Sequence, residues 1–197
     1  MLERQSFDSW APRYNRSLLQ FFTFVPVHRA VINEALVAGV TPGDILDVGC
    51  GTGLLLDRAA GQWKDARCTG IDYADAMIGE AMKNHAGNPR FRFKAGDAAS
   101  LPVESAAFDI AFSTVSFHHW ADQGGGIREI ARALRPHGLF VLADIGLPRI
   151  LRFLKRGAAG SRVRQRLFEQ AGFSIIIQHR PIRIAFQVLV TVGRKIS

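Results

Sequence analysis

The chain alternates between short apolar runs, which are typical of strands, and longer segments in which apolar residues recur with helical spacing. Residues 108–115 form a nearly continuous apolar run, as expected of a strand that is buried on both faces. The pattern predicts strands at 44–48, 67–71, 91–95, 108–115, 139–145, 173–177 and 184–192. It predicts helices at 54–62, 74–84, 127–134 and 163–171, with further helical patterning at 18–36.

This order of elements predicts an α/β fold. Strands that alternate with crossover helices pair in parallel, and right-handed crossovers place helices on both faces of the sheet. The ligand site of such a sheet is expected at the carboxyl ends of its central strands. Residues 135–138 (Arg-Pro-His-Gly) are predicted to form a turn. Only the region around Arg180 and Pro181 separates the last two strands, so these two are expected to be antiparallel.

A glycine-rich loop follows the first predicted strand, with the sequence Asp-Val-Gly-Cys-Gly-Thr-Gly from Asp47 to Gly53. Glycines let a backbone turn tightly and approach a ligand closely. The spacing is not that of a GxGxxG dinucleotide loop, because Leu54 stands where the third glycine would be. No Lys-Ser/Thr pair follows, so the loop is not a P-loop. The acidic residue that opens the loop favours a ligand with an ammonium group.

Two further acidic residues follow the next two predicted strands. Asp72 ends the second strand, 25 residues after Asp47, where a carboxylate can accept hydrogen bonds from ribose hydroxyls. The alternative is that Asp72 or Asp75 caps the helix that follows. Asp97 follows the third strand and could accept from the exocyclic amine of a base; the alternative is a turn aspartate.

These motifs resemble those of class I S-adenosylmethionine-dependent methyltransferases, and most nearly the ubiquinone- and menaquinone-biosynthesis branch of small-molecule enzymes. The resemblance covers roughly residues 40–195, and 5–40 weakly. The segments that carry it are ILDVGCGTG, GIDYADAMI, GDAASLP, FDIAFSTVSFHHW and LRPHGLFVLADI. It implies a three-layer Rossmann-like fold with a seven-stranded, mostly parallel sheet in the order 3-2-1-4-5-7-6, the last strand antiparallel. It also implies a helical lid or extension at 1–40 and a methyltransferase domain at 41–197.

The resemblance also implies a set of cofactor-binding residues. The loop backbone would wrap the methionine part of the cofactor, Asp72 would bind the ribose, and Tyr73 would pack on the adenine. Asp97 and Ala98 would meet the adenine edge, and the strand end near Thr114 would face the amino group. Tyr14 would close over the cofactor, although Asn15 stands where the family often has Asp. The complete predicted set is Tyr14, Asp47, Gly49, Cys50, Gly51, Gly53, Asp72, Tyr73, Met77, Asp97, Ala98 and Thr114.

Methyl transfer from a sulfonium is an in-line displacement, so the protein supplies orientation and a dry pocket. A general base is needed only when the acceptor must lose a proton. His118 and His119, just past the fourth predicted strand, are the candidate bases, since histidine titrates near neutral pH. Adjacent side chains usually point apart, so at most one is expected to face the substrate. The alternative is that both only pack the loop or line the pocket.

Composition bounds the remaining possibilities. The chain is 48% hydrophobic and 21% charged, which excludes a disordered or fibrous protein. Cys50 and Cys68 are its only cysteines, so no disulfide scaffold or zinc cluster is expected, and no other metal site is predicted. The sequence contains no signal pattern and no run long enough to span a membrane, so a cytoplasmic, soluble monomer or homodimer is expected.

The net charge of +8 is concentrated in the second part of the chain. Residues 1–126 have a net charge of −3, whereas 127–197 have a net charge of +11. Residues 149–166 contain seven basic residues and no acidic one, which indicates either a solvated surface or contact with an anionic partner. Within this region, 147–156 has the pattern of an amphipathic helix, which could contact a membrane surface or form a mobile lid over an apolar acceptor pocket.

Several absences narrow the acceptor to oxygen, carbon or nitrogen of a small or lipid-like molecule. The fourth strand does not end in Asn/Asp-Pro-Pro-Tyr, and no Pro-Cys nucleophile or cysteine cluster is present. Three alternatives stay open: a nicotinamide-dependent oxidoreductase, an RNA methyltransferase or nucleic-acid-binding module that uses the basic stretch, and a cofactor-binding protein without activity. The basic stretch contains few aromatic residues that could stack on bases, so nucleic acid is a less favoured partner than a small molecule.

Overall fold

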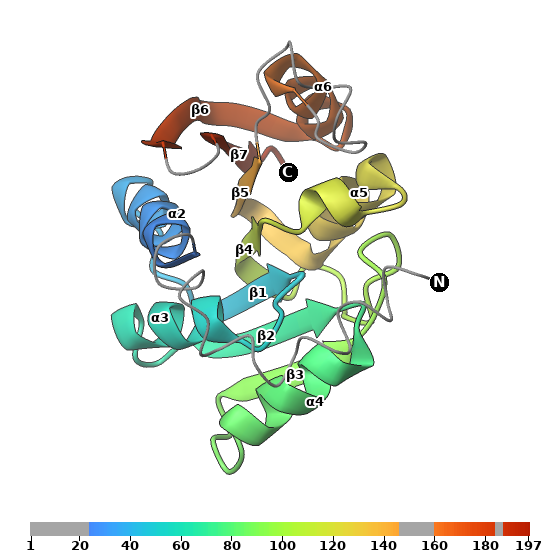
Figure 1. The fold of residues 1–197 in the computed structure, drawn as a ribbon. Helices are drawn as coiled ribbons and strands as arrows, with labels where there is room; N and C mark the ends of the chain where they lie inside the picture. The colour runs from blue at the N-terminus through green and yellow to red at the C-terminus, as the bar shows by residue number, and fades with distance from the viewer. Residues whose placement is uncertain (1–23, 146–159, 184–186) are drawn as a thin grey trace.

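A computed structural model of the protein describes residues 24–145, 160–183 and 187–197. Its seven strands form one sheet in the order β3-β2-β1-β4-β5-β7-β6 (Figure 1). The strands are β1 (Asp44–Val48), β2 (Arg67–Asp72), β3 (Phe91–Ala95), β4 (Phe108–Thr114), β5 (Leu134–Ile145), β6 (Phe173–Arg183) and β7 (Gln187–Lys195). The pairs among β3, β2, β1, β4 and β5 are parallel, and β7 is antiparallel to both β5 and β6. The predicted fold class, strand order and antiparallel strand are confirmed.

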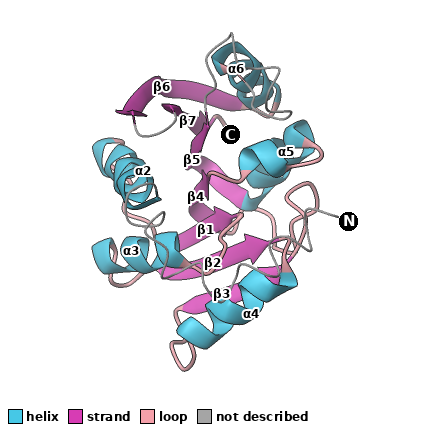
Figure 2. Cartoon of the chain, viewed as in Figure 1, coloured by secondary structure: helices cyan, strands magenta, loops and turns pink. Residues whose placement is uncertain are grey.

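Helices flank the sheet on both faces (Figure 2). They are α2 (Val25–Val37), α3 (Leu54–Gln62), α4 (Asp75–Asn84), the short 3₁₀ helix η2 (Phe117–His119), α5 (Gln123–Ala133) and α6 (Ser161–Gln170). Residues of α2 and α3 pack on one face of the sheet, and residues of α5 and α6 pack on the other. Val27, Val31 and Ala35 of α2 are fully buried in the first of these cores. The division of the chain at residue 40 stays a prediction.

The segment 135–138 is not the predicted turn between a helix and a strand. β5 begins at Leu134, which pairs with Phe108, and the next paired residues are Leu139 and Ile110. The extra residues on β5 form an irregularity, with His137 in the left-handed region at φ +63°. Proline and glycine therefore mark a bulged strand here, as they do at irregular points of sheets.

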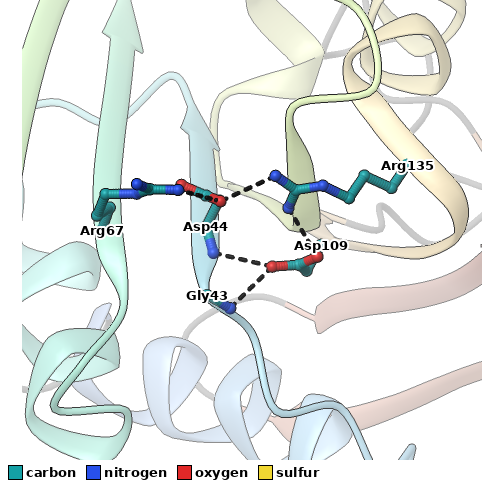
Figure 3. Close-up of polar contacts among 5 residues, drawn as sticks. All are labelled: Gly43, Asp44, Arg67, Asp109 and Arg135. Carbon is teal, nitrogen blue, oxygen red and sulfur yellow. Dashed lines mark hydrogen bonds and ion pairs between the residues drawn. The ribbon is translucent and has the colours of Figure 1, made fainter.

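Ion pairs join the amino ends of four strands (Figure 3). Arg67 of β2 donates to both carboxylate oxygens of Asp44 at 2.7 and 2.8 Å. Arg135 of β5 donates to Asp44 at 3.0 Å and to Asp109 of β4 at 2.7 Å. Asp109 also accepts from the backbone N–H groups of Gly43 and Asp44 at 2.8 and 2.9 Å. This amino-end cluster, formed by Asp44, Arg67, Asp109 and Arg135, ties β1 to its neighbours at the edge opposite the glycine loop.

Some predicted features lie outside the described residues. They are Tyr14, the whole of 147–156, and the basic stretch before residue 160. Among the helices that the structure describes, none is both long and apolar enough to cross a membrane.

Candidate active site

The glycine loop connects β1 to α3 at the carboxyl edge of the sheet. Gly49, Gly51 and Gly53 all have positive φ, at +78°, +53° and +89°. L side chains rarely adopt this conformation, which explains the three glycines. A Cβ on Gly49 would lie 2.2 Å from Oγ of Ser116, so that glycine also lets the loop meet the turn after β4. The N–H groups of Gly49 and Cys50 donate to the Ile71 carbonyl at 2.8 and 3.1 Å, which fixes the loop against β2.

Asp72 connects the loop to the end of β2. Its Oδ2 accepts from the Gly51 N–H at 2.8 Å, and its Oδ1 accepts from the Ala74 N–H at 2.9 Å. Burial raises the pKa of this carboxyl group, and the backbone donors of Ala74, Gly51 and Tyr73 oppose that shift. The bond to Ala74 belongs to the turn before α4 and is not a helix cap, because Ala74 is itself the N-cap residue and Asp75 is the first residue of the helix. Each carboxylate oxygen can accept more than one hydrogen bond, so these backbone bonds and ribose binding are compatible.

Asp47 is a buried carboxyl group with one oxygen atom that receives no hydrogen bond. The residue is 1% exposed, and its Oδ1 has no hydrogen-bond partner in the structure. Burial, and then the nearby charge of Asp72, raise the pKa of Asp47 well above its ordinary value. An unsatisfied buried acceptor in a folded protein calls for an explanation, and a bound ligand is one. An ammonium group placed beside Asp47 would supply both the donor and the opposite charge, so this site fits the amino-acid part of S-adenosylmethionine.

The other predicted cofactor residues follow the ends of neighbouring strands. Cys50, Met77, Ala98 and Thr114 are buried, whereas Tyr73 is exposed. Asp97 is exposed two residues beyond β3, where its Oδ1 accepts from the Ala99 N–H at 2.8 Å. That bond is the turn interaction named as its alternative. The structure therefore brings together the loop, Asp47 and Asp72, and places Asp97 in a turn farther along the same edge of the sheet.

The turn after β4 is held in an unusual conformation. Val115 has φ +53°, which is rare for a β-branched residue and costs about 1–3 kcal/mol. Its N–H donates to the Ala143 carbonyl of β5 at 2.8 Å. Oγ of Ser116 donates to the Val48 carbonyl at 3.1 Å and lies 2.8 Å from Oγ of Ser113. These bonds hold the turn against β1 and β5, and they therefore fix the position of η2, which follows the turn.

His118 in η2 forms a buried pair with Asp144 of β5. Its Nδ1 lies 2.7 Å from Oδ1 of Asp144, and its backbone N–H donates to Oδ2 at 2.6 Å. The Asp144 side chain is fully buried and the His118 side chain is 5% exposed. Asp144 was not among the predicted site residues. Its place near the end of β5, one strand from the predicted histidines, was the only available signal.

His119 differs from His118 in its surroundings. His119 is exposed, and the two imidazole rings pack with their centroids 4.0 Å apart, so they do not point apart as expected. His118 has a buried carboxylate 2.7 Å from its Nδ1. The geometry separates the two candidate bases and favours His118.

Comparisons with known proteins show which family this chain resembles. Residues 46–142 match the family described as "Methyltransferase domain". The chain is 33% identical over 147 residues to an O-methyltransferase of Penicillium expansum, covering 67% of this chain and 52% of the relative. It is 36% identical over 115 residues to the 27-O-demethylrifamycin SV methyltransferase of Amycolatopsis mediterranei, covering 55% and 42% of the two chains. It is 35% identical over 104 residues to a malonyl-[acyl-carrier protein] O-methyltransferase of Hahella chejuensis, covering 53% and 37%.

Solved structures share the fold at low sequence identity. A chain from the complex between the Haloferax volcanii Trm112 methyltransferase activator and its methyltransferase superimposes with a TM-score of 0.77 at 23% identity, covering 97% of this chain and 98% of that one. A SAM-dependent methyltransferase from Aquifex aeolicus superimposes with a TM-score of 0.73 at 16% identity, covering 98% of both.

The chain spans about half or less of the length of the curated relatives that it matches. The matched region nevertheless includes the glycine loop, Asp72 and the β4 turn, and it favours methyl transfer over a nicotinamide-dependent oxidoreductase or a nucleic-acid-binding module. The motifs, the strand order and the family match together show that this chain belongs to the class I S-adenosylmethionine-dependent methyltransferases.

Proposed function

We propose that this chain transfers the methyl group of S-adenosylmethionine to a hydroxyl oxygen of a small molecule. The observation that carries the proposal is the buried pair of His118 and Asp144 at the carboxyl edge of β4 and β5. A base is needed where the acceptor must lose a proton, as a hydroxyl does. The relatives named above are O-methyltransferases, which supports oxygen as the acceptor atom.

The residues around the glycine loop would hold the cofactor. Asp47 would face its ammonium group with Thr114 nearby, the loop backbone would surround the methionine part, and Asp72 would accept from the ribose hydroxyls. Tyr73, Met77, Asp97 and Ala98 are proposed to hold the adenine, and Tyr14 to cover the site. When bound, S-adenosylmethionine supplies an electrophilic methyl group on a sulfonium.

His118 is the proposed general base. A carboxylate accepts hydrogen bonds and does not donate them, so Nδ1 of His118 would carry a proton directed at Asp144, and Nε2 would take the hydroxyl proton. As the methyl group is transferred to oxygen, the proton passes to Nε2, and Asp144 stabilises the imidazolium that forms. The fixed η2 turn holds the ring in place, so little reorganisation is needed at that step.

Other properties belong to the same proposal. A lipid-like acceptor, contact with a membrane surface through 147–156, and a monomeric or homodimeric state remain predictions from the sequence. Cys50 and Cys68 are free and buried, which suits a reducing compartment such as the cytoplasm.

Replacement of the base tests the proposal. The enzyme is incubated with S-adenosylmethionine labelled in the methyl group and a panel of hydroxyl-bearing metabolites, and products are identified by mass spectrometry. His118→Asn should lower kcat by about 10²- to 10⁴-fold while cofactor affinity is retained. His137→Asn, which changes the histidine of the β5 irregularity, is the matched control. Unchanged activity in His118→Asn, or a methyl group found only on carbon or nitrogen, would contradict the proposal.

A further inference from the structure

Arg164 of α6 is a fully buried arginine near the end of the basic stretch. Its side chain is among the largest that the structure buries completely, whereas Arg162 and Arg166 on the same helix are exposed. Charged side chains are rarely buried unless a partner or a function requires it. The described part of the basic stretch is therefore not only a solvated face.

The guanidinium group of Arg164 contacts residues that adjoin Asp144 and His118. It donates from a terminal nitrogen to the Leu189 carbonyl at 2.9 Å, and Leu189 of β7 pairs directly with Asp144 of β5. Its Cζ lies 5.6 Å from the ring centroid of Phe117, the residue before His118. The buried Arg164 side chain therefore contacts Phe117, which precedes His118, and Leu189, which pairs with Asp144 across the strands.

The charges of Arg164 and Asp144 influence each other. Burial lowers the pKa of Arg164 to about 10, and the negative charge of Asp144 opposes that effect. Arg164 is therefore still charged at neutral pH. Asp144 is fully buried, and an unpaired buried carboxylate would be costly.

We propose that Arg164 is a positioning residue for methyl transfer, whose buried charge offsets that of Asp144 and so limits how strongly this carboxylate stabilises a proton on the His118 ring. This inference rests on the proposed function only in naming His118 as the base. A carboxylate beside an imidazole favours the protonated ring, and a cation on the far side of the carboxylate reduces that preference.

The effect on His118 depends on the charged groups around it. Among the described residues, Asp144 of β5 pairs with His118, the His119 ring packs on it, and Arg164 of α6 acts through Asp144. Without Arg164, the charge of Asp144 would act on His118 alone. The carboxylate should then stabilise the protonated form of the His118 ring more strongly than it does in the wild type.

Two substitutions separate the charge of Arg164 from its hydrogen bond. Arg164→Gln removes the charge but keeps an N–H donor for the Leu189 carbonyl, and Arg164→Lys keeps the charge. The pKa of His118 is measured by NMR titration of its imidazole signal, which is assigned by its loss in His118→Asn. We expect the His118 pKa to rise by about 1 unit in Arg164→Gln and to stay near the wild-type value in Arg164→Lys. Arg166→Gln, at an exposed position of the same helix, should leave it unchanged.

An unchanged His118 pKa in folded Arg164→Gln would overturn the inference and leave Arg164 a purely structural residue. If Arg164→Gln does not fold, Arg164→Lys provides the test. Because this variant keeps the charge, a His118 pKa that shifts by about 1 unit would also overturn the inference. The titration needs no acceptor or activity, so it is independent of the proposed function. If Arg164→Gln shifts the His118 pKa but His118→Asn is fully active, the inference holds and the proposed function fails.

Discussion

At the residue scale, Asp72 combines a structural role with the proposed role in ribose binding. Its two oxygens already hold the Gly51 and Ala74 N–H groups, so the carboxylate is fixed before a ligand arrives. Fixed acceptors lose little side-chain entropy on binding, which makes their hydrogen bonds more effective.

Asp72→Ala should weaken the binding of S-adenosylmethionine by about 1–3 kcal/mol, the scale of charge-assisted hydrogen bonds lost in a buried site. Titration calorimetry measures the change. Asp65→Ala, at an exposed position outside the loop, is the control and should bind as the wild type does. Wild-type affinity in Asp72→Ala would remove the ribose assignment.

Gly51→Val should abolish cofactor binding while the protein stays folded. A β-branched side chain at φ +53° strains the loop by about 1–2 kcal/mol and adds bulk where the cofactor backbone contacts are proposed. Gly61→Ala is the matched control, because Gly61 lies in the α3 helix and an added Cβ would meet nothing within 4 Å. Circular dichroism checks the fold and calorimetry checks binding; normal binding by Gly51→Val would mean that the loop is only structural.

The site residues that were predicted from the sequence lie in local motifs, whereas those that only the structure revealed depend on contacts between distant segments. Asp47, Asp72 and the glycines belong to continuous motifs, and their local backbone needs are visible in the chain itself. Asp144 and Ser116 act through partners on other elements, His118 of η2 and Val48 of β1. Those contacts depend on strand register and on the left-handed Val115. No local pattern encodes that register, so these residues needed the structure.

At the element scale, the strands were predictable where apolar runs are short and flanked by turn residues. Residues 44–48 were placed correctly, because burial on both faces gives a continuous run. The start of β5 was not, because Pro136 and Gly138 normally indicate a turn, and only pairing of Leu134 with Phe108 makes the segment part of the sheet. Tertiary pairing thus overrode the local signal.

The amino-end cluster should contribute to stability without affecting the site. Arg135→Met removes the ion pairs to Asp44 and Asp109, and because Arg135 is partly exposed, the free energy of unfolding should fall by only about 1 kcal/mol. Denaturant unfolding measures this change, and cofactor affinity should be unaltered. A loss of binding in Arg135→Met would show coupling between the two edges of the sheet.

The pH dependence of that variant follows from Asp44. Arg67 and, less strongly, Arg135 lower the pKa of Asp44 below its ordinary value of 3.8, while burial opposes them. A carboxyl group with a lowered pKa stabilises the fold above that value and loses the contribution as the pH falls through the folded pKa. The stability difference between wild type and Arg135→Met should therefore shrink below about pH 4. A constant difference down to pH 2 would show that the ion pairs are not its cause.

At the scale of the whole molecule, the two edges of the sheet differ in how their polar groups are satisfied. The amino edge contains paired charges, whereas the carboxyl edge contains the unpartnered Oδ1 of Asp47, the strained Val115 and the buried His118–Asp144 pair. Strain and unsatisfied groups collect at functional sites because a ligand or a reaction requires them there. The parallel strand order fixes which edge this is, since all the central strands end there.

Direct binding measurement on the intact chain tests the central claim. In titration calorimetry, S-adenosylmethionine and its demethylated product, S-adenosylhomocysteine, should each bind at one molecule per chain, and NAD should give no binding heat under the same conditions. Binding of NAD in place of the two sulfur ligands, or no binding by either of them to the folded protein, would contradict the account.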